Sequence, residues 1–185
     1  MAIKTFSVGE VLTASDTNTY LANSGLVYVT STTFGGATAL NIDGCFTSSF
    51  THYLIQVNVV PNASTTLVYY LRAGGTSNAA NNTISTGYYQ TMGTATVNGD
   101  TQAATTYGKI GYGESTYGAV YNLWVWNPQT ATTTFSHSDA VANNFTGHYD
   151  IIHQVSTQYD GIRLTTSTGT PTLSGNVRIY GARIL

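Results

Sequence analysis

Histidine and aspartate side chains lie close together in the segment HYDIIH, which spans residues 148–153, and both are ligand types that bind zinc and similar metals. Successive side chains of a β-strand point to opposite faces, so His148 and Asp150 share one face and His153 lies on the other. The three cannot converge on one ion without a bulge. We therefore expect no metal site here and no cofactor.

A second histidine–aspartate pair, His137 and Asp139, also shares a face in an extended segment. Neither a third ligand nor a nucleophile stands near this pair in the sequence. We expect a hydrogen-bonded pair in a loop.

Carboxylate pairs are the groups that hydrolyse glycosidic bonds, and the chain has eight carboxylates in all. Three of them, Glu114, Asp139 and Asp150, are the candidates for this role, four others have capping or turn roles, and Glu10 is the eighth. The carboxylates with such roles are Asp16, at a helix start, and Asp43, Asp100 and Asp160, each next to a glycine. No feature of the sequence pairs the remaining three.

Motifs of other enzyme classes are missing from the sequence, which has neither a G-x-S-x-G elbow nor a P-loop. We therefore predict that the protein is not an enzyme. A glycan hydrolase stays open as an alternative.

Aromatic side chains offer a binding function instead. Tyrosine gives a large contact area at a small entropy cost and keeps a polar tip, so it is favoured in recognition surfaces. The alternative is that these rings pack on strands or at a seam between subunits. The candidates for ligand or subunit contact are Tyr88, Tyr89, Tyr107, Tyr112, Trp124 and Trp126.

The composition favours an all-β protein. Charged residues make up 8% of the 185 residues, about a third of the usual share, and Thr, Ser, Asn, Gly and Tyr replace them. Thr and Tyr favour strands, whereas Lys and Glu favour helices. A surface with so little charge also suits a protein that packs against copies of itself, because soluble monomers rely on surface charge.

The same composition argues against several partners. The six basic residues are scattered and the net charge is −2, so the basic footprint that nucleic acids require is missing. No apolar run approaches the ~20 residues that span a membrane, and the N-terminus lacks the apolar core of a secretory signal. Cys45 is alone, which leaves no disulfide framework and no cysteine metal site.

Period-2 alternation predicts eight to ten strands and an antiparallel, jelly-roll-like β-sandwich over residues 26–185. In the best strand, residues 52–60, the odd-numbered side chains from Tyr53 to Val59 face inward. Residues 67–73 are expected to return as its hairpin partner. The strand over residues 117–126 is apolar on both faces, so a second layer or a subunit interface should cover it twice. Shorter strands are expected at 26–30, 88–91, 94–97, 109–112, 130–136 and 148–156.

The last stretch of the chain predicts two further strands, which we expect to form a closing hairpin. Ile162 and Leu164 alternate with polar residues, and so do Val177 and Ile179 after a turn region at 167–172. These four apolar side chains should lie in the core.

Residues 1–25 form a separate N-terminal segment in which a short helix is predicted between Ser7 and Asn23. Thr13 can cap a helix whose third residue is Asp16, and Gly25 suits its end. A helix of about ten residues is marginal without packing, so this one should dock, either on its own domain or on a neighbouring chain. The apolar residues available for docking are Val11, Leu12, Tyr20 and Leu21.

The run FSVGEVLTASDTNTYL, residues 6–21, resembles the opening of many tailed-bacteriophage virion proteins, which often place an F-x-x-G-E-V-L-T-A-x-D-x-N segment before a β-rich body. The residues YDGI at 159–162, SGNVR at 174–178 and Tyr180-Gly181 resemble the closing hairpin of a β-domain common in phage structural proteins. The resemblance covers some forty-five residues at the two ends of the chain.

This resemblance implies a non-enzymatic virion structural protein that is assembled in the host cytoplasm and exposed on the particle. A tail fibre or other tail appendage, attached through the N-terminal segment and homotrimeric, is the first expectation. A capsid decoration protein on the head and a carbohydrate-binding receptor module are the alternatives. The expected partners are copies of itself, other tail or capsid proteins, and host surface glycans.

Overall fold

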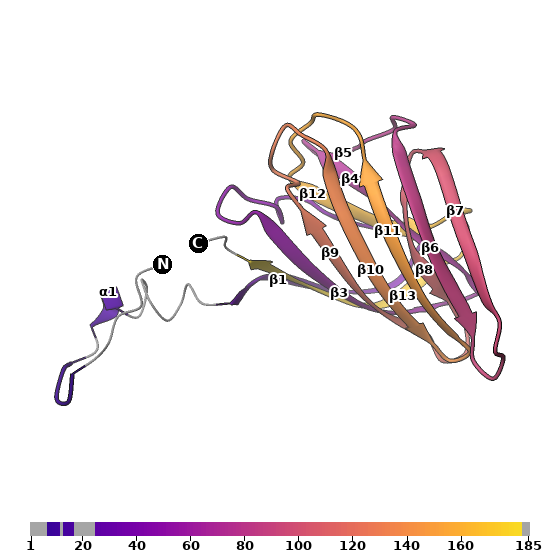
Figure 1. Ribbon diagram of the computed structural model, residues 1–185, viewed down its shortest axis with the longest axis horizontal. Helices are drawn as coiled ribbons and strands as arrows, with labels where there is room; N and C mark the ends of the chain where they lie inside the picture. The colour runs from indigo at the N-terminus through magenta and orange to yellow at the C-terminus, as the bar shows by residue number, and fades with distance from the viewer. Residues whose placement is uncertain (1–6, 12, 17–24, 183–185) are drawn as a thin grey trace.

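The computed structural model describes residues 7–11, 13–16 and 25–182, and nearly all of its regular structure is antiparallel β-strand (Figure 1). Two sheets face each other across one core in a sandwich-like arrangement. The prediction of an all-β protein is therefore confirmed. The sequence predicts eight to ten strands, and the described part of the chain has thirteen.

The larger sheet, called sheet A, has eight strands. In spatial order they are β1 (Leu26–Ala37), β13 (Leu173–Ala182), β3 (His52–Pro61), β9 (Ala119–Trp126), β10 (Thr134–Ala142), β11 (Phe145–His153), β6 (Thr83–Thr91) and β7 (Val97–Thr105). Strands β9, β10, β11, β6 and β7 follow one another as antiparallel neighbours.

The smaller sheet, sheet B, has five strands. They are β2 (Ala39–Ile42), β12 (Gly161–Thr166), β4 (Thr65–Ala73), β5 (Thr76–Ser77) and β8 (Gly108–Gly113). One edge of β4 pairs with β12, while β8 and β5 pair with successive parts of β4.

The core lies between the sheets and is formed by the residues that alternation predicts. On β3, Tyr53 and Ile55 are fully buried, as is Leu123 on β9. Ile162 and Val177, from the last two strands, are also fully buried. Burying each such side chain contributes about 1.5–3 kcal/mol, so these strands anchor the fold.

Strand β8 packs directly on sheet A because the inward face of β10 is made of small side chains, namely Thr134, Ser136, Ser138, Ala140 and Ala142, all buried. The closest approach is at Gly111, where a Cβ atom would lie 2.6 Å from that of Ala140. Glycine is required at this point, since its φ of +149° is also one that other residues rarely adopt.

Hydroxyl groups of sheet A satisfy the backbone of β8 on this side. Ser138 Oγ donates to the carbonyl of Ile110 at 2.7 Å, and the amide of Lys109 donates to Ser85 Oγ at 3.1 Å. These bonds matter because an unpaired buried backbone group costs about 1–3 kcal/mol. The Ser- and Thr-rich composition therefore serves the interior as well as the surface.

Two predicted hairpins are wrong. β3 pairs with β13 and β9 in sheet A, whereas β4 pairs with strands of sheet B. Likewise β12 belongs to sheet B and β13 to sheet A. Alternation reveals which face of a strand is buried but not its partner, and in both cases the short connection crosses from one sheet to the other.

The outer face of β9 is not covered by a second layer of the described residues, which leaves the other alternative for its second cover, a subunit interface, as a prediction. Val120 is 50% exposed, and Trp124 and Trp126 are half-buried on the same outer face. The next strand begins at Thr134 rather than at residue 130 and continues through Ala142, a stretch that the sequence assigns partly to a loop.

The N-terminal segment shows less helix than predicted. A single helical turn, α1, spans Ala14–Asp16, and residues 17–24, where the helix would continue, lie outside the described residues. Before α1, a turn brings the amide of Ser7 to the carboxylate of Glu10 at 3.0 Å. No helix in the described ranges is long and apolar enough to cross a membrane.

Candidate functional site

A pocket of about 360 Å³ opens between β8 and three strands of sheet A, β6, β7 and β11. Pockets of this size that combine aromatic walls with a few polar groups are typical ligand sites. The lining residues are Thr66, Tyr89, Gly99, Asp100, Lys109, Tyr112, Phe145 and Tyr149.

Three aromatic rings form one wall. Tyr89 and Phe145 stack with their centroids 4.7 Å apart and their planes 16° apart, and Tyr112 lies 5.0 Å from Phe145 at 34°. On β11, Gly147 pairs with Tyr89 in the strand register. Because Gly147 has no side chain, nothing at this position separates the aromatic rings from the backbone of β11. The result is a continuous aromatic surface that is only partly buried.

The charged groups of the pocket are paired with each other. Lys109 Nζ forms an ion pair with Asp100, and both side chains are less than one-fifth exposed. The Tyr149 hydroxyl donates to Asp100 Oδ2 at 3.4 Å. Burial, and secondarily the Asp100 charge, raises the pKa of Tyr149, so the phenol keeps its proton and remains a donor.

Gly87 makes this arrangement possible. It lies between Asp100 and Tyr149 in the register of β7, β6 and β11. A Cβ atom at this position would come within 2.7 Å of the Tyr149 ring. The missing side chain therefore lets Tyr149 extend across β6 to the carboxylate.

The predicted contact residues do not form one surface. Tyr89 and Tyr112 meet in the pocket, whereas Tyr88 points to the outer face of sheet A. Tyr107 packs edge-on against Tyr70, with ring centroids 5.9 Å apart. The two tryptophans, Trp124 and Trp126, stack on the outer face of β9 at 6.3 Å.

Sequence reasoning missed Asp100, Lys109 and Phe145 as lining residues. The glycine next to Asp100 predicts a turn role for this aspartate, but strand β7 runs through both residues and the preceding turn lies before Val97. The alternation of Phe145, Gly147 and Tyr149 was the available signal, and it becomes visible only if the strand is extended back to residue 145.

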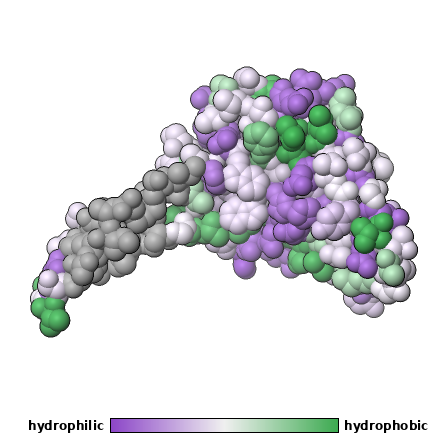
Figure 2. All heavy atoms as spheres, viewed as in Figure 1, coloured by the Kyte–Doolittle hydropathy of each residue, from purple (hydrophilic) through white to green (hydrophobic). Residues whose placement is uncertain are grey.

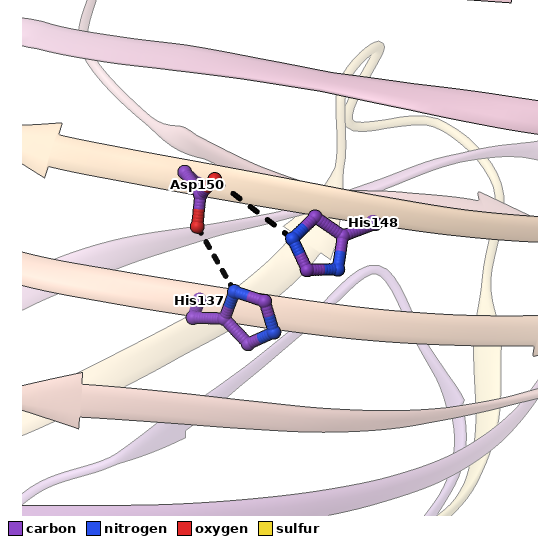
Figure 3. A group of neighbouring side chains, drawn as sticks. All are labelled: His137, His148 and Asp150. Atoms are coloured by element: carbon purple, nitrogen blue, oxygen red, sulfur yellow. Dashed lines mark hydrogen bonds and ion pairs between the residues drawn. The ribbon is translucent and has the colours of Figure 1, made fainter.

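The second cluster of chemical interest lies on the outer face of sheet A (Figure 3). His148 and Asp150 share this face, and His153 lies on the opposite side, 3% exposed, so the predicted division of the three side chains between the two faces is confirmed. His137 and Asp139 lie on β10 and not in a loop. His137 pairs directly with Asp150 across the strands, and Asp139 pairs with His148.

Each imidazole of this cluster contacts both carboxylates. His137 Nδ1 lies 2.9 Å from Asp150, and its Nε2 lies 3.4 Å from Asp139. His148 Nδ1 lies 3.0 Å from Asp139, and its Nε2 lies 3.8 Å from Asp150. No sequence pattern indicates this convergence, because it depends on the register between β10 and β11.

The remaining hydrolase candidate, Glu114, has a structural role. Its carboxylate accepts hydrogen bonds from the amides of Thr116 and Tyr117 at 2.7 and 3.0 Å. These amides lower the pKa of Glu114, which stays ionised in its turn.

The described part of the N-terminal segment is open to solvent. Residues 7–11 and 13–15 are all exposed, and Val11 is 80% exposed. The other predicted anchoring residues, Leu12, Tyr20 and Leu21, lie outside the described residues.

Comparison with known proteins finds no family model that matches the chain and no match among curated proteins.

Proposed function

We propose that this chain is a non-enzymatic structural protein of a tailed-phage virion. In this proposal it is a tail fibre or other tail-appendage component that attaches through its N-terminal segment and exposes a β-sandwich body. The observation that carries the proposal is the run GEVLTASD, residues 9–16, which resembles phage virion openings and whose apolar Val11 finds no cover in the single chain.

The geometry of this segment supports an attachment role. Val8, inside the turn closed by Ser7 and Glu10, is fully exposed, and Val11, directly after this turn, is 80% exposed. Exposed valines lose the stabilisation of about 25 cal/mol per Å² that burial would give, so contact with another protein would be favourable.

We assign the body to the jelly-roll-like class of sandwiches. Its support is the way the chain alternates between layers: β1 and β2, β3 and β4, and β12 and β13 are each divided between the two sheets. Such crossings, rather than local hairpins, are typical of Greek-key and jelly-roll topologies.

Homotrimerisation is part of the proposal, with copies of the same chain as the occupants of the outer face of sheet A. Figure 2 shows apolar side chains scattered among hydrophilic ones over the visible face of the body. Large apolar residues on the outer face of sheet A are between 42% and 57% exposed: Val60, Val97, Val120, Phe135 and Val141. With 8% charged residues, this surface has little to oppose self-association.

A capsid decoration protein is the alternative within the same class. Attachment through the N-terminal segment suits this role equally, because an exposed apolar segment can dock on a head or on a tail. The position of the chain on the particle distinguishes the two.

A carbohydrate-binding receptor module is the second candidate function, and the pocket favours it. The rings of Tyr89, Tyr112 and Phe145 offer apolar surface for the C–H face of a sugar, while Asp100 and Lys109 offer polar partners for its hydroxyls. This activity is compatible with a virion protein that recognises a host surface glycan.

Particle incorporation tests the attachment proposal. A tagged full-length chain and a chain lacking residues 1–24 are supplied during phage assembly, and purified particles are probed for the tag. We expect the full chain to enter particles and the truncated chain to remain folded but free. Equal incorporation of both chains would contradict the proposal.

A double substitution sharpens this test. Val8→Asp with Val11→Asp should reduce incorporation at least tenfold. Its matched control, Gln154→Asp with Gln158→Asp, adds the same charge at exposed positions of the body and should leave incorporation unchanged. Equal losses in the two variants would attribute the effect to charge and not to attachment.

A further inference from the structure

We propose that His137, His148 and Asp150 bind one divalent transition-metal ion of the zinc type on the outer face of sheet A. The three ligands offer donor atoms that all lie within 4.8 Å of one another (Figure 3). Asp139 contacts the other nitrogen of each ring, 3.0 Å from His148 Nδ1 and 3.4 Å from His137 Nε2, and so orients the imidazoles instead of binding their ion.

The backbone register holds these four side chains at the corners of a rectangle. Strand β10 contributes His137 and Asp139, two residues apart and therefore on one face. On β11, Asp150 lies opposite His137 and His148 lies opposite Asp139. Histidines therefore occupy one diagonal and aspartates the other. Both strands are interior strands of an eight-stranded sheet, which keeps the four Cα positions fixed.

The donor spacing is close to what a metal requires. Zinc bonds to nitrogen and oxygen of about 2.0–2.1 Å in a tetrahedral site place ligand atoms roughly 3.4 Å apart. One nitrogen of each ring faces Asp150, His137 Nδ1 at 2.9 Å and His148 Nε2 at 3.8 Å, and these two spacings bracket this value. The Asp150 side chain is 61% exposed, so its carboxylate can rotate toward an ion without disturbing the core.

The electrostatics also favour a cation. With neutral imidazoles the four groups have a formal charge of −2, and their neighbours in the register carry no charge. These neighbours are Trp124, Asn122, Thr86 and Tyr88. A divalent ion would cancel the charge, whereas the surrounding side chains leave it uncompensated.

The ligand set selects the class of metal. Calcium and magnesium prefer sites built from oxygen, while two imidazoles with carboxylates suit zinc and its neighbours among the transition metals. The Tyr88 ring stacks on His148, with centroids 5.3 Å apart and planes 15° apart, which orients that imidazole. An ion held in this way would link β10 to β11 on the solvent side of the sheet.

Titration of the purified chain, produced without a polyhistidine tag, tests this proposal. Calorimetry with Zn²⁺ should show one ion bound per chain, and Co²⁺ should give the visible absorption bands of a tetrahedral site. Binding should raise the unfolding temperature as the ion concentration rises. No saturable binding of either ion would overturn the proposal.

Variants identify the ligands. His148→Gln and the near-isosteric Asp150→Asn should each weaken Zn²⁺ binding at least tenfold, and circular dichroism checks that both fold. His52→Gln, at another partly exposed histidine on the same face, should bind like the unchanged chain. Retention of binding by both cluster variants, or an equal loss in the His52 variant, would place the ion elsewhere and overturn the assignment.

Discussion

Tyr89 on β6 and Phe145 on β11 stack face to face, with ring centroids 4.7 Å apart and planes within 16° of parallel. The two residues are more than fifty positions apart in the sequence and meet only because β6 and β11 are neighbours in sheet A. Their stacked rings define the wall of the pocket, so the proposed sugar-binding activity depends on this pair more than on any other.

Removing either ring should weaken glycan binding. We expect Tyr89→Ala and Phe145→Ala each to lose at least tenfold in affinity for a host glycan, because each removes aromatic surface from the pocket. Glycan-array screening followed by calorimetry measures the loss.

Tyr117→Ala is the matched control, since this tyrosine is 71% exposed and does not line the pocket. It should bind glycans like the unchanged chain. If the pocket variants also bind normally, the pocket is not the glycan site.

The packing of β8 on sheet A makes a prediction about stability. Gly111→Ala should lower the free energy of unfolding by about 1–3 kcal/mol, because the added methyl group overlaps Ala140 and Tyr121 in a tightly packed layer. Gly99→Ala, where a Cβ atom meets nothing within 4 Å, should change stability little. Chemical denaturation of both variants provides the measurement, and equal effects would show that β8 does not approach sheet A as described.

The burial of His153 leads to a prediction of how the free energy of unfolding depends on pH. The ring is buried between the hydroxyls of Thr83 and Tyr159, at 2.8 and 2.7 Å, and burial lowers its pKa below the ordinary value of 6.5. The unfolded chain therefore takes up a proton near pH 6.5 while the folded chain does not. The contribution of His153 to the free energy of unfolding should therefore be constant above pH 6.5. Below this pH it should fall by at most about 1.4 kcal/mol per pH unit.

Comparison of variants isolates this contribution. His153→Gln should be less stable at pH 7 and should show a flatter decline between pH 7 and pH 5, measured by urea denaturation. His52→Gln should keep the full decline. A decline that is identical in the His153 variant and the unchanged chain would assign the pH dependence to other groups.

Much of the core could be predicted because burial follows alternation. Tyr53, Ile55, Ile162 and Val177 are fully buried as the period-2 pattern requires. What alternation could not supply was the partner of each strand. The connections after β3 and β12 look like hairpin loops in the sequence, yet each crosses between the sheets.

Because alternation does not reveal strand partners or register, the candidate sites could be predicted only in part. His148 and Asp150 could be placed on one face from the sequence, but their meeting with His137 needs the register between β10 and β11. Tyr89 and Tyr112 could be named as candidates, whereas their convergence on Phe145 needs the position of β8 over sheet A. The pocket therefore depends on contacts between strands distant in sequence, and the histidine–aspartate cluster depends on the register of two consecutive strands.

Mass spectrometry of purified phage particles tests the central claim most directly. If the chain is a virion structural protein, its peptides should be present in particles freed of host proteins, at a fixed ratio to the major capsid protein and in a copy number divisible by three. Tail fractions should contain it, whereas recovery with empty heads would indicate the decoration alternative. Absence of the chain from purified particles, despite its presence in the infected cell, would contradict the claim.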